Sequence, residues 1–279
     1  MRPPFSYYGG KQVIANWIIE NLPAHELYCE PFCGGAAVFW AKPPSKLEVL
    51  NDTNGEIVNF FRVCQDRALF EELQHRLQWT PYARDEHRKA CKEPHNEPVD
   101  RAWAWMVNVN MGYFNKIGSG FGGAKRIEHR NHAETWYKRI DELLIFSDAI
   151  RERLHNTSIQ NIDALACIEK YDSPGNLFYC DPPYINTDQG HYKGYTEADH
   201  IRLLDCLTSI KSSFVLSGYP NDLTPTDWPC ITRATTATSA AGRHGKGKGA
   251  RTECLWIMDR STQSKHPELF DGVMMRRTA

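Results

Sequence analysis

The sequence lacks the features that would assign it to a membrane, to a secreted class or to a common metal site. No apolar run approaches the roughly 20 residues of a membrane-spanning helix, and Pro3 and Pro4 interrupt any signal-peptide pattern. The nine cysteines form no C-x-x-C pair, which argues against a zinc knuckle. Their odd number and apolar surroundings predict reduced, buried thiols. We therefore expect a cytoplasmic protein with no membrane contact and no metal.

An excess of positive charge is also missing, because the formal net charge is −1 and the sequence pI is about 6.8. Nucleic-acid enzymes of this size are often more basic, so the global charge disfavours DNA or RNA. Two local basic clusters, at residues 111–139 and in the acid-free, glycine-rich stretch 243–251, offset this. Residues 242–248 also fit the start of a phosphate-binding loop. Gly249 stands where Ser or Thr is needed, which argues against a nucleoside triphosphate.

The dinucleotide fingerprint G-x-G-x-x-G is absent, although a glycine turn at residues 31–35 follows the predicted strand Leu27–Glu30 and precedes a helix. The next predicted strand, residues 47–50, leads to Asp52, eighteen residues after Gly34. Doubly wound sheets place an acid at about 20 residues to bind ribose hydroxyls. A retained acid without the fingerprint favours a nucleoside cofactor that has no pyrophosphate, such as S-adenosylmethionine.

The most informative motif is Asp181-Pro182-Pro183-Tyr184, directly after the apolar strand expected at residues 177–180. Two prolines donate no ladder hydrogen bond, so the strand ends there in a stiff turn. A carboxylate, carbonyls without competing N–H groups and an aromatic ring then project together from the strand end. This arrangement suits a planar ring with an exocyclic amine. Asp181 and the Pro182 carbonyl would accept the amine hydrogens, and Tyr184 would stack on the ring.

Along the chain an α/β pattern is interrupted once. After the first two strands, apolar runs predict strands at residues 157–160, 177–180 and 214–217 and a hairpin at 230–236 and 253–258. Residues 65–154 show no convincing strand, and the helices expected there cover residues 69–77, 84–91, 102–111 and 140–154. A short helix before the first strand is expected to have an apolar face of Val13, Ile14, Trp17 and Ile18. The sequence thus predicts an α/β fold with a mainly helical insertion.

Four segments occur in an order that resembles a known family. They are Tyr7-Tyr8-Gly9-Gly10-Lys11, residues 30–35, residues 51–54 and the motif at residues 181–184. In this order they resemble the Dam-like (D12 class) DNA adenine-N6 methyltransferases, and residues 217–219 and 253–257 resemble the phage-borne branch of that family. The resemblance covers residues 5–62 and 157–258. It is weak over residues 65–150, where family members carry target recognition.

The resemblance implies a Rossmann-like S-adenosylmethionine-dependent methyltransferase sheet in residues 1–64 and 155–279, and a target-recognition, DNA-binding insertion in residues 65–154. It implies S-adenosyl-L-methionine as cofactor and double-stranded DNA as partner of a monomer or weak dimer, and it leaves a cognate restriction nuclease open. The expected catalytic residues are Asp181, Pro182 and Tyr184. The expected cofactor-binding residues are Tyr7, Lys11, Glu30, Phe32, Gly34, Asp52, Asp163 and Asp181. The expected DNA-binding residues are Asn115, Lys116, Arg126, Arg243, Lys246 and Lys248.

Two of these residues also have an ordinary structural interpretation. Asp163 matches a family acid near the cofactor adenine, but Asp is also favoured as the N-cap of a helix. The two roles are compatible. Lys11 either binds the carboxylate of the methionine moiety or lies at an exposed helix start, and the resemblance favours the first role.

The expected reaction is methyl transfer from S-adenosylmethionine to the N6 amine of an adenine flipped out of duplex DNA. An N4-cytosine methyltransferase uses the same amine chemistry but more often has Ser in place of Asp181. Protein-glutamine methyltransferases usually have Asn there, and an RNA methyltransferase is a further alternative. An alternative outside the enzymes is a DNA-binding protein that keeps the fold but is catalytically silent. The presence of Asp52, Asp181 and Tyr184 argues against silence.

We predict different roles for two DNA-facing segments. Neutralising Lys246 and Lys248, in a stretch of glycines and cations, should weaken DNA binding evenly across sequences and lower the salt slope by about one per lost contact. Changing Asn115 or Lys116, which lie among aromatic and amide side chains suited to base edges, should instead shift the methylated motif. Binding titrations over a salt series and sequencing of methylated sites measure both effects. A lysine pair that alters the motif, with insertion changes that alter only affinity, contradicts this assignment.

Overall fold

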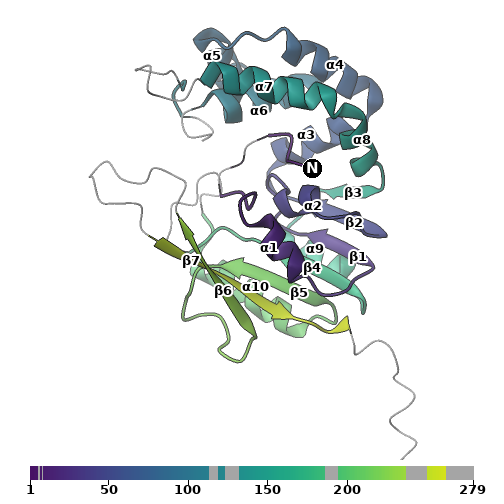
Figure 1. Cartoon of the computed structure of the whole chain (residues 1–279), viewed down its shortest axis with the longest axis vertical. Coiled ribbons are helices and arrows are strands. Elements are labelled where there is room, and N and C mark those ends of the chain that lie inside the picture. The colour runs from purple at the N-terminus through teal and green to yellow at the C-terminus, as the bar shows by residue number, and fades with distance from the viewer. Residues whose placement is uncertain are drawn as a thin grey trace, which may run out of the picture.

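Seven strands form one mixed sheet in the computed structural model, which describes residues 1–5, 7, 9–112, 119–122, 132–185, 194–236 and 250–261 (Figure 1). The strands lie in the order β3-β2-β1-β4-β5-β7-β6. The first five pair in parallel, and β7 runs antiparallel to both of its neighbours. Their bounds are β1 Leu27–Glu30, β2 Leu47–Asn51, β3 Thr157–Gln160, β4 Asn176–Cys180, β5 Ser213–Gly218, β6 Cys230–Thr236 and β7 Ala250–Met258. The predicted strands and the final hairpin are confirmed.

The strand order reverses between β1 and β4. Strands β2 and β3 extend the sheet on one side of β1, whereas β4 and β5 extend it on the other. Cys29 of β1 pairs with Phe178 of β4, so the segments that leave these strands at Pro31 and Asp181 emerge side by side at the carboxyl edge. In open α/β sheets, ligands bind in the crevice at such a switch point.

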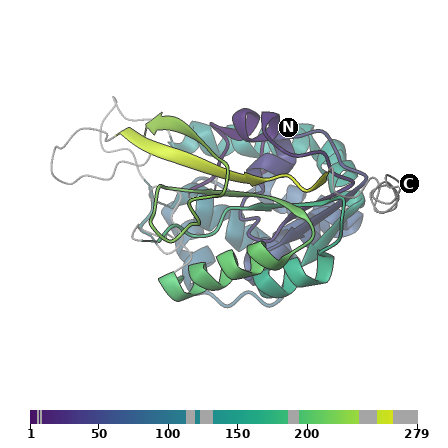
Figure 2. The same cartoon turned by 90° about the horizontal axis from the view of Figure 1, so that it is seen from below.

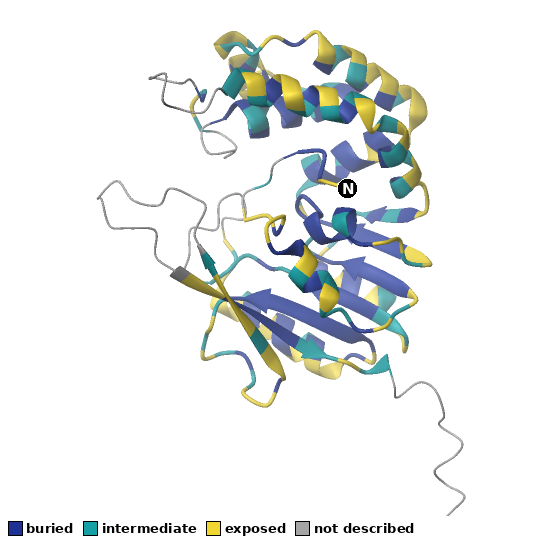
Figure 3. Ribbon diagram, viewed as in Figure 1, coloured by how far each residue is buried: buried dark blue, intermediate teal, exposed yellow. Residues whose placement is uncertain are grey.

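Helices cover both faces of the sheet, as the two perpendicular views show (Figures 1 and 2). Alternate strand residues point to opposite faces. Tyr28 and Leu50 belong to the core cluster that contains residues of α1, α2 and α3, whereas Cys29 and Val49 pack with α9 and α10. The helices are α1 Ala15–Glu20, α2 Ala37–Ala41, α3 Gly55–Gln65, α9 Ala164–Tyr171 and α10 Glu197–Ser209. Because both faces are buried (Figure 3), the parallel strands read as nearly continuous apolar runs.

The helices described between α3 and β3 lie beyond the β3 edge of the sheet, at the top of Figure 1. They are α4 Arg67–Gln78, α5 Arg84–Lys92, α6 Pro98–Met111, α7 His132–Ile145 and α8 Ser147–His155. Their apolar core continues that of the sheet: the Phe5 ring centroid lies 5.0 Å from that of Phe60 in α3 and 5.6 Å from that of Trp105 in α6. Within the described residues, no helix has both the length and the apolarity that a bilayer span requires.

Two helix predictions need correction. A single helix was expected over residues 140–154, but α7 ends at Ile145 and α8 begins at Ser147, with Phe146 outside helical geometry at φ −98° and ψ 15°. The break changes the direction of the chain, and α8 packs against α3 and β3. At the first helix, Val13 is 81 % exposed, so it does not belong to the apolar face that the N-cap residue Ile14 and Ile18 of α1 form.

Candidate active site

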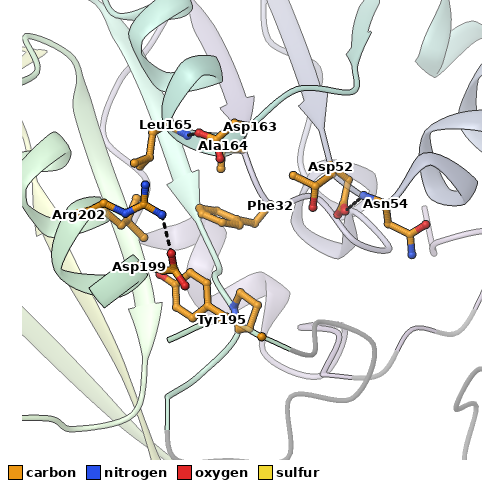
Figure 4. A pocket seen from close by; sticks show the side chains of 14 residues that line it. Phe32, Asp52, Asn54, Asp163, Ala164, Leu165, Tyr195, Asp199 and Arg202 are labelled. Carbon is orange, nitrogen blue, oxygen red and sulfur yellow. Dashed lines mark hydrogen bonds and ion pairs between the residues drawn. The ribbon is translucent and has the colours of Figure 1, made fainter. Parts of the chain in front are cut away.

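A cavity of about 460 Å³ opens at the carboxyl edge of the sheet, next to the switch point (Figure 4). This volume lies in the range of small-ligand sites, about 300–1,000 Å³. Phe32, from the turn after β1, projects between the polar groups of the wall. The side chains that also line the cavity include Asp52, Asp163, Leu165, Tyr195, Asp199 and Arg202. Aromatic and apolar faces alternate here with carboxylates, as a site for a nucleoside requires.

The glycine turn after β1 is tied to the end of β2 by one carboxylate. Asp52 Oδ2 accepts a hydrogen bond from the Gly34 N–H at 2.9 Å, and Oδ1 accepts one from the Asn54 N–H at 2.9 Å. Gly34 has φ 47°, a left-handed conformation that glycine adopts without strain. Gly35 is needed for a different reason, since a Cβ there would lie 2.9 Å from the Tyr7 Cβ. The acid predicted from its spacing therefore lies in the wall of the cavity and also closes the turn.

Asp163 is the N-cap of α9, as its sequence position allowed, and it also lines the cavity. Its Oδ1 accepts hydrogen bonds from the Leu165 N–H at 2.9 Å and the Ala166 N–H at 3.2 Å, which caps the start of α9. The same side chain faces the cavity across from Asp52 (Figure 4). The two interpretations of Asp163 are thus compatible in the structure.

Asp181, the first residue after β4, is held by side chains from two distant parts of the chain. Lys11 Nζ lies 2.8 Å from both carboxylate oxygens, and Ser217 at the end of β5 donates to Oδ1 at 2.8 Å. Burial alone would lower the pKa of Lys11, but the charges of Asp181 and Glu253 outweigh it and raise this pKa above its ordinary value. Lys11 is therefore a buried ammonium ion beside the Asp-Pro-Pro-Tyr turn.

Tyr184 is oriented by contacts on several sides. Its hydroxyl donates to Glu253 of β7, its ring centroid lies 4.8 Å from Lys11 Nζ, and the Tyr219 ring meets it edge-on at 4.6 Å. Burial, with Asp181 and Glu253 adding to it, raises the pKa of Tyr184 well above its ordinary value, so the phenol keeps its proton and remains a donor.

The prediction of site residues missed Glu253 and Ser217. An acid directly before the apolar run of residues 254–258 is the signal that could have identified Glu253, because a buried acid requires partners. Ser217 carries no comparable signal, since its hydroxyl lies next to Asp181 only through the pairing of β4 with β5.

Glu30 lies at the end of β1 but does not line the cavity. It is 2 % exposed, and its Oε1 accepts hydrogen bonds from the Tyr28 hydroxyl and the Phe39 N–H, each at 2.8 Å. Burial raises the pKa of Glu30 to about 7, with a smaller contribution from Asp181, although the two hydrogen bonds oppose the shift. Its contacts position the start of α2 beside the glycine turn. Tyr7 packs nearby, with its ring centroid 6.3 Å from that of Trp105.

The residues predicted to bind DNA all lie outside the described residues. They are Asn115, Lys116, Arg126, Arg243, Lys246 and Lys248. Of the second basic cluster, Arg251 at the start of β7 is described, and it donates to the Tyr219 hydroxyl at 3.0 Å. The basic segment thus leads directly into the contacts around Tyr184.

The structure is a Rossmann-like doubly wound sheet with a nucleoside-sized cavity at its switch point and the Asp-Pro-Pro-Tyr turn beside it. The family model described as "D12 class N6 adenine-specific DNA methyltransferase" matches residues 7–226. The chain belongs to this family. The family's cofactor, S-adenosyl-L-methionine, is therefore the cofactor of this protein.

Individual relatives agree with this assignment. The type II methyltransferase M1.LlaDCHI of Lactococcus lactis subsp. cremoris is 27 % identical over 243 residues, which cover 81 % of this chain and 82 % of that protein. The DNA N-6-adenine-methyltransferase of Escherichia phage P1 is 28 % identical over 66 % of this chain, but the match spans only 24 % of that longer protein. The retron Ec67 DNA adenine methylase of Escherichia coli is 25 % identical, over 71 % of this chain and 70 % of its own length.

The raised pKa of Glu30 predicts a pH dependence of stability. In the folded state the carboxyl keeps its proton up to about pH 7, whereas in the unfolded chain it loses it near 4.5. The folded state therefore binds more protons between these values, and the free energy of unfolding should fall by about 3 kcal/mol as the pH rises through this window. Glu30→Gln should remove that decline, as measured by urea unfolding at pH 5 and pH 7.5. Glu26→Gln, which alters an exposed acid, is the control and should leave the decline in place.

Proposed function

We propose that the protein is a site-specific DNA methyltransferase that transfers a methyl group from S-adenosylmethionine to the N6 amine of an adenine flipped out of double-stranded DNA. The observation that carries this proposal is the Asp181 carboxylate at the end of β4, beside the cavity and in contact with Lys11 and Ser217. It is supported by membership of the adenine-specific family and by relatives that are themselves named as DNA adenine methyltransferases.

The cavity suits the adenosine portion of the cofactor. Phe32 and Leu165 offer flat or apolar faces for a purine, Asp52 lies where it can accept ribose hydroxyls, and Asp163 can accept from the adenine edge. When bound, S-adenosylmethionine supplies an electrophilic methyl group. The residues that line the cavity would hold the cofactor and Asp181 would hold the amine, and such positioning would supply a large part of the rate.

The target amine needs help to act as a nucleophile, because its lone pair is delocalised into the adenine ring. Asp181 and the Pro182 carbonyl accept its two hydrogens and free the lone pair, which is electrostatic stabilisation by fixed acceptors. The Pro182 carbonyl has no competing N–H at the next residue, Pro183. Flipping the base out of the duplex costs a few kcal/mol, and stacking on the pre-oriented Tyr184 ring offsets part of this.

We also propose that the helical segment of residues 65–154 selects the DNA sequence and that the basic stretch 243–251 holds phosphates. The proposed division into a catalytic part, residues 1–64 and 155–279, and this insertion is supported by the single interruption of the α/β pattern. Base-edge contacts and phosphate contacts are separable functions, because only the former carry sequence information.

Asp181→Ala should abolish methyl transfer while the chain stays folded. Loss of one fixed electrostatic contact at the reacting group typically costs roughly 10²–10³-fold in rate. A methyl-transfer assay and circular dichroism on the same preparation measure the two properties. The matched control is Asp172→Ala: this carboxylate accepts hydrogen bonds from the Lys211 and Ser212 N–H groups before the amino end of β5 and does not line the cavity. Activity above about a tenth of wild type in Asp181→Ala refutes the assigned role.

Asp52→Ala should weaken cofactor binding far more than DNA binding. Loss of a charge-assisted hydrogen bond to the ribose costs roughly 1.5–3 kcal/mol, which is about 10–150-fold in affinity. Isothermal calorimetry with S-adenosylmethionine measures it directly. Because Asp52 also closes the glycine turn, Asp66→Ala serves as the control for a lost backbone cap, since Asp66 accepts from the Leu69 N–H at the start of α4. Equal cofactor affinity in the two variants removes Asp52 from the site.

A further inference from the structure

Glu253 is a buried acid on β7, directly before the apolar run of residues 254–258. It lies on β7, one residue before the Cys254–Gly218 pair with which the β5–β7 pairing begins, and it is 4 % exposed. A buried carboxylate is costly unless it is paired. Its Oε1 accepts the Tyr184 hydroxyl hydrogen, and Lys11 Nζ lies 3.7 Å from the same oxygen. Both partners of Glu253, Tyr184 and Lys11, belong to the candidate active site.

Lys11 binds the Asp181 carboxylate, which the proposed reaction needs as the acceptor for the adenine amine. Its ammonium group lies 2.8 Å from both oxygens of Asp181, and Ser217 takes a further position on Oδ1. A carboxylate offers about four lone-pair positions, so little of its capacity remains for an incoming amine. An ammonium group in contact also cancels the negative charge that is to polarise that amine. Lys11 therefore has to withdraw from Asp181 before the amine can be held there.

Glu253 offers the nearest place for the ammonium group to go. A shift of about 1 Å brings Lys11 Nζ from 3.7 Å to hydrogen-bond distance of Glu253 Oε1. The Tyr184 ring, whose centroid lies 4.8 Å from Nζ, borders the path, and its hydroxyl binds the same oxygen. The positive charge of Lys11 thus stays paired at either end of the movement.

We propose that Glu253 is a positioning residue that draws Lys11 away from Asp181 as the target adenine enters and holds the Tyr184 ring in its stacking orientation. This inference rests on the proposed function, because it requires Asp181 to accept the amine of the base. It assigns to β7, at the far side of the crevice from the cofactor cavity, a part in freeing the catalytic carboxylate.

The test is Glu253→Gln in the full-length chain, with single-turnover transfer of tritiated methyl groups to genomic DNA that lacks N6-methyladenine. The rate should fall roughly 10–100-fold, since Lys11 then remains on Asp181. The dissociation constants for S-adenosylmethionine and for DNA should change less than about threefold, a split that a loss of folding does not produce. Glu152→Gln, which changes an exposed acid on α8, is the matched control and should keep the wild-type rate.

Two further variants make the outcome decisive. Glu253→Asp keeps the charge, should fold even if the glutamine variant does not, and should lose roughly 3–10-fold in rate because its carboxylate is withdrawn from Lys11. Tyr184→Phe removes only the hydroxyl contact and should lose less than Glu253→Gln. A wild-type rate in both Glu253 variants overturns the inference, and so does a loss confined to cofactor affinity. If Asp181→Ala is inactive in the same assay, the proposed function stands even then, whereas an active Asp181→Ala overturns that function itself.

Discussion

The reversal of strand order between β1 and β4 is the constraint on which the site depends. It brings two chain segments more than 140 residues apart, the glycine turn and the Asp-Pro-Pro-Tyr turn, to adjacent positions at one edge of the sheet. Neither turn is a site by itself. The glycine turn supplies backbone and the Phe32 face to the cavity, and the other turn carries Asp181 and Tyr184, which both contact Lys11. In the proposed function, their adjacency brings the cofactor and the target base together at one edge of the sheet.

The acids around this edge fall into two groups, those held by donors fixed in the fold and those paired with a lysine side chain. Asp52 accepts from backbone N–H groups, which cannot leave, so it is fixed in the wall of the cavity. Glu30 sits among fixed donors as well and holds a proton up to about pH 7. Asp181 and Glu253 share one lysine side chain, Lys11, as an ion-pair partner. In the proposed function, the two acids that share Lys11 are the ones next to the reacting base.

The strands could be read from the sequence because parallel strands buried on both faces have to be apolar throughout. Asp52 and Asp181 could be read as well, since each directly follows such a strand. The contact between Lys11 and Asp181 could not, because it joins residues 170 positions apart and depends on how the N-terminal segment crosses the sheet. The break at Phe146 was also hidden, since helix periodicity continues across it and only the packing of α8 on α3 and β3 requires it. Local pattern thus identified the acids, and tertiary pairing decided their partners.

The helical segment is joined to the sheet by buried polar contacts as well as by apolar packing. Arg153 of α8 forms an ion pair with Glu48 of β2, and both side chains are less than 10 % exposed. Gln65, at the end of α3, donates to the carbonyls of Leu154 at 2.8 Å and Thr157 at 2.7 Å, which ties the start of the segment to its end. Removing one partner of a buried pair costs about 3–5 kcal/mol, so these contacts define the direction in which the helices leave the sheet. A segment that selects a DNA sequence has to deliver one base to Asp181, and a misplacement of about 1 Å costs roughly 10²-fold in rate. Rigid attachment at its base is therefore a requirement of the proposed function, and the polar contacts at Arg153 and Gln65 meet it.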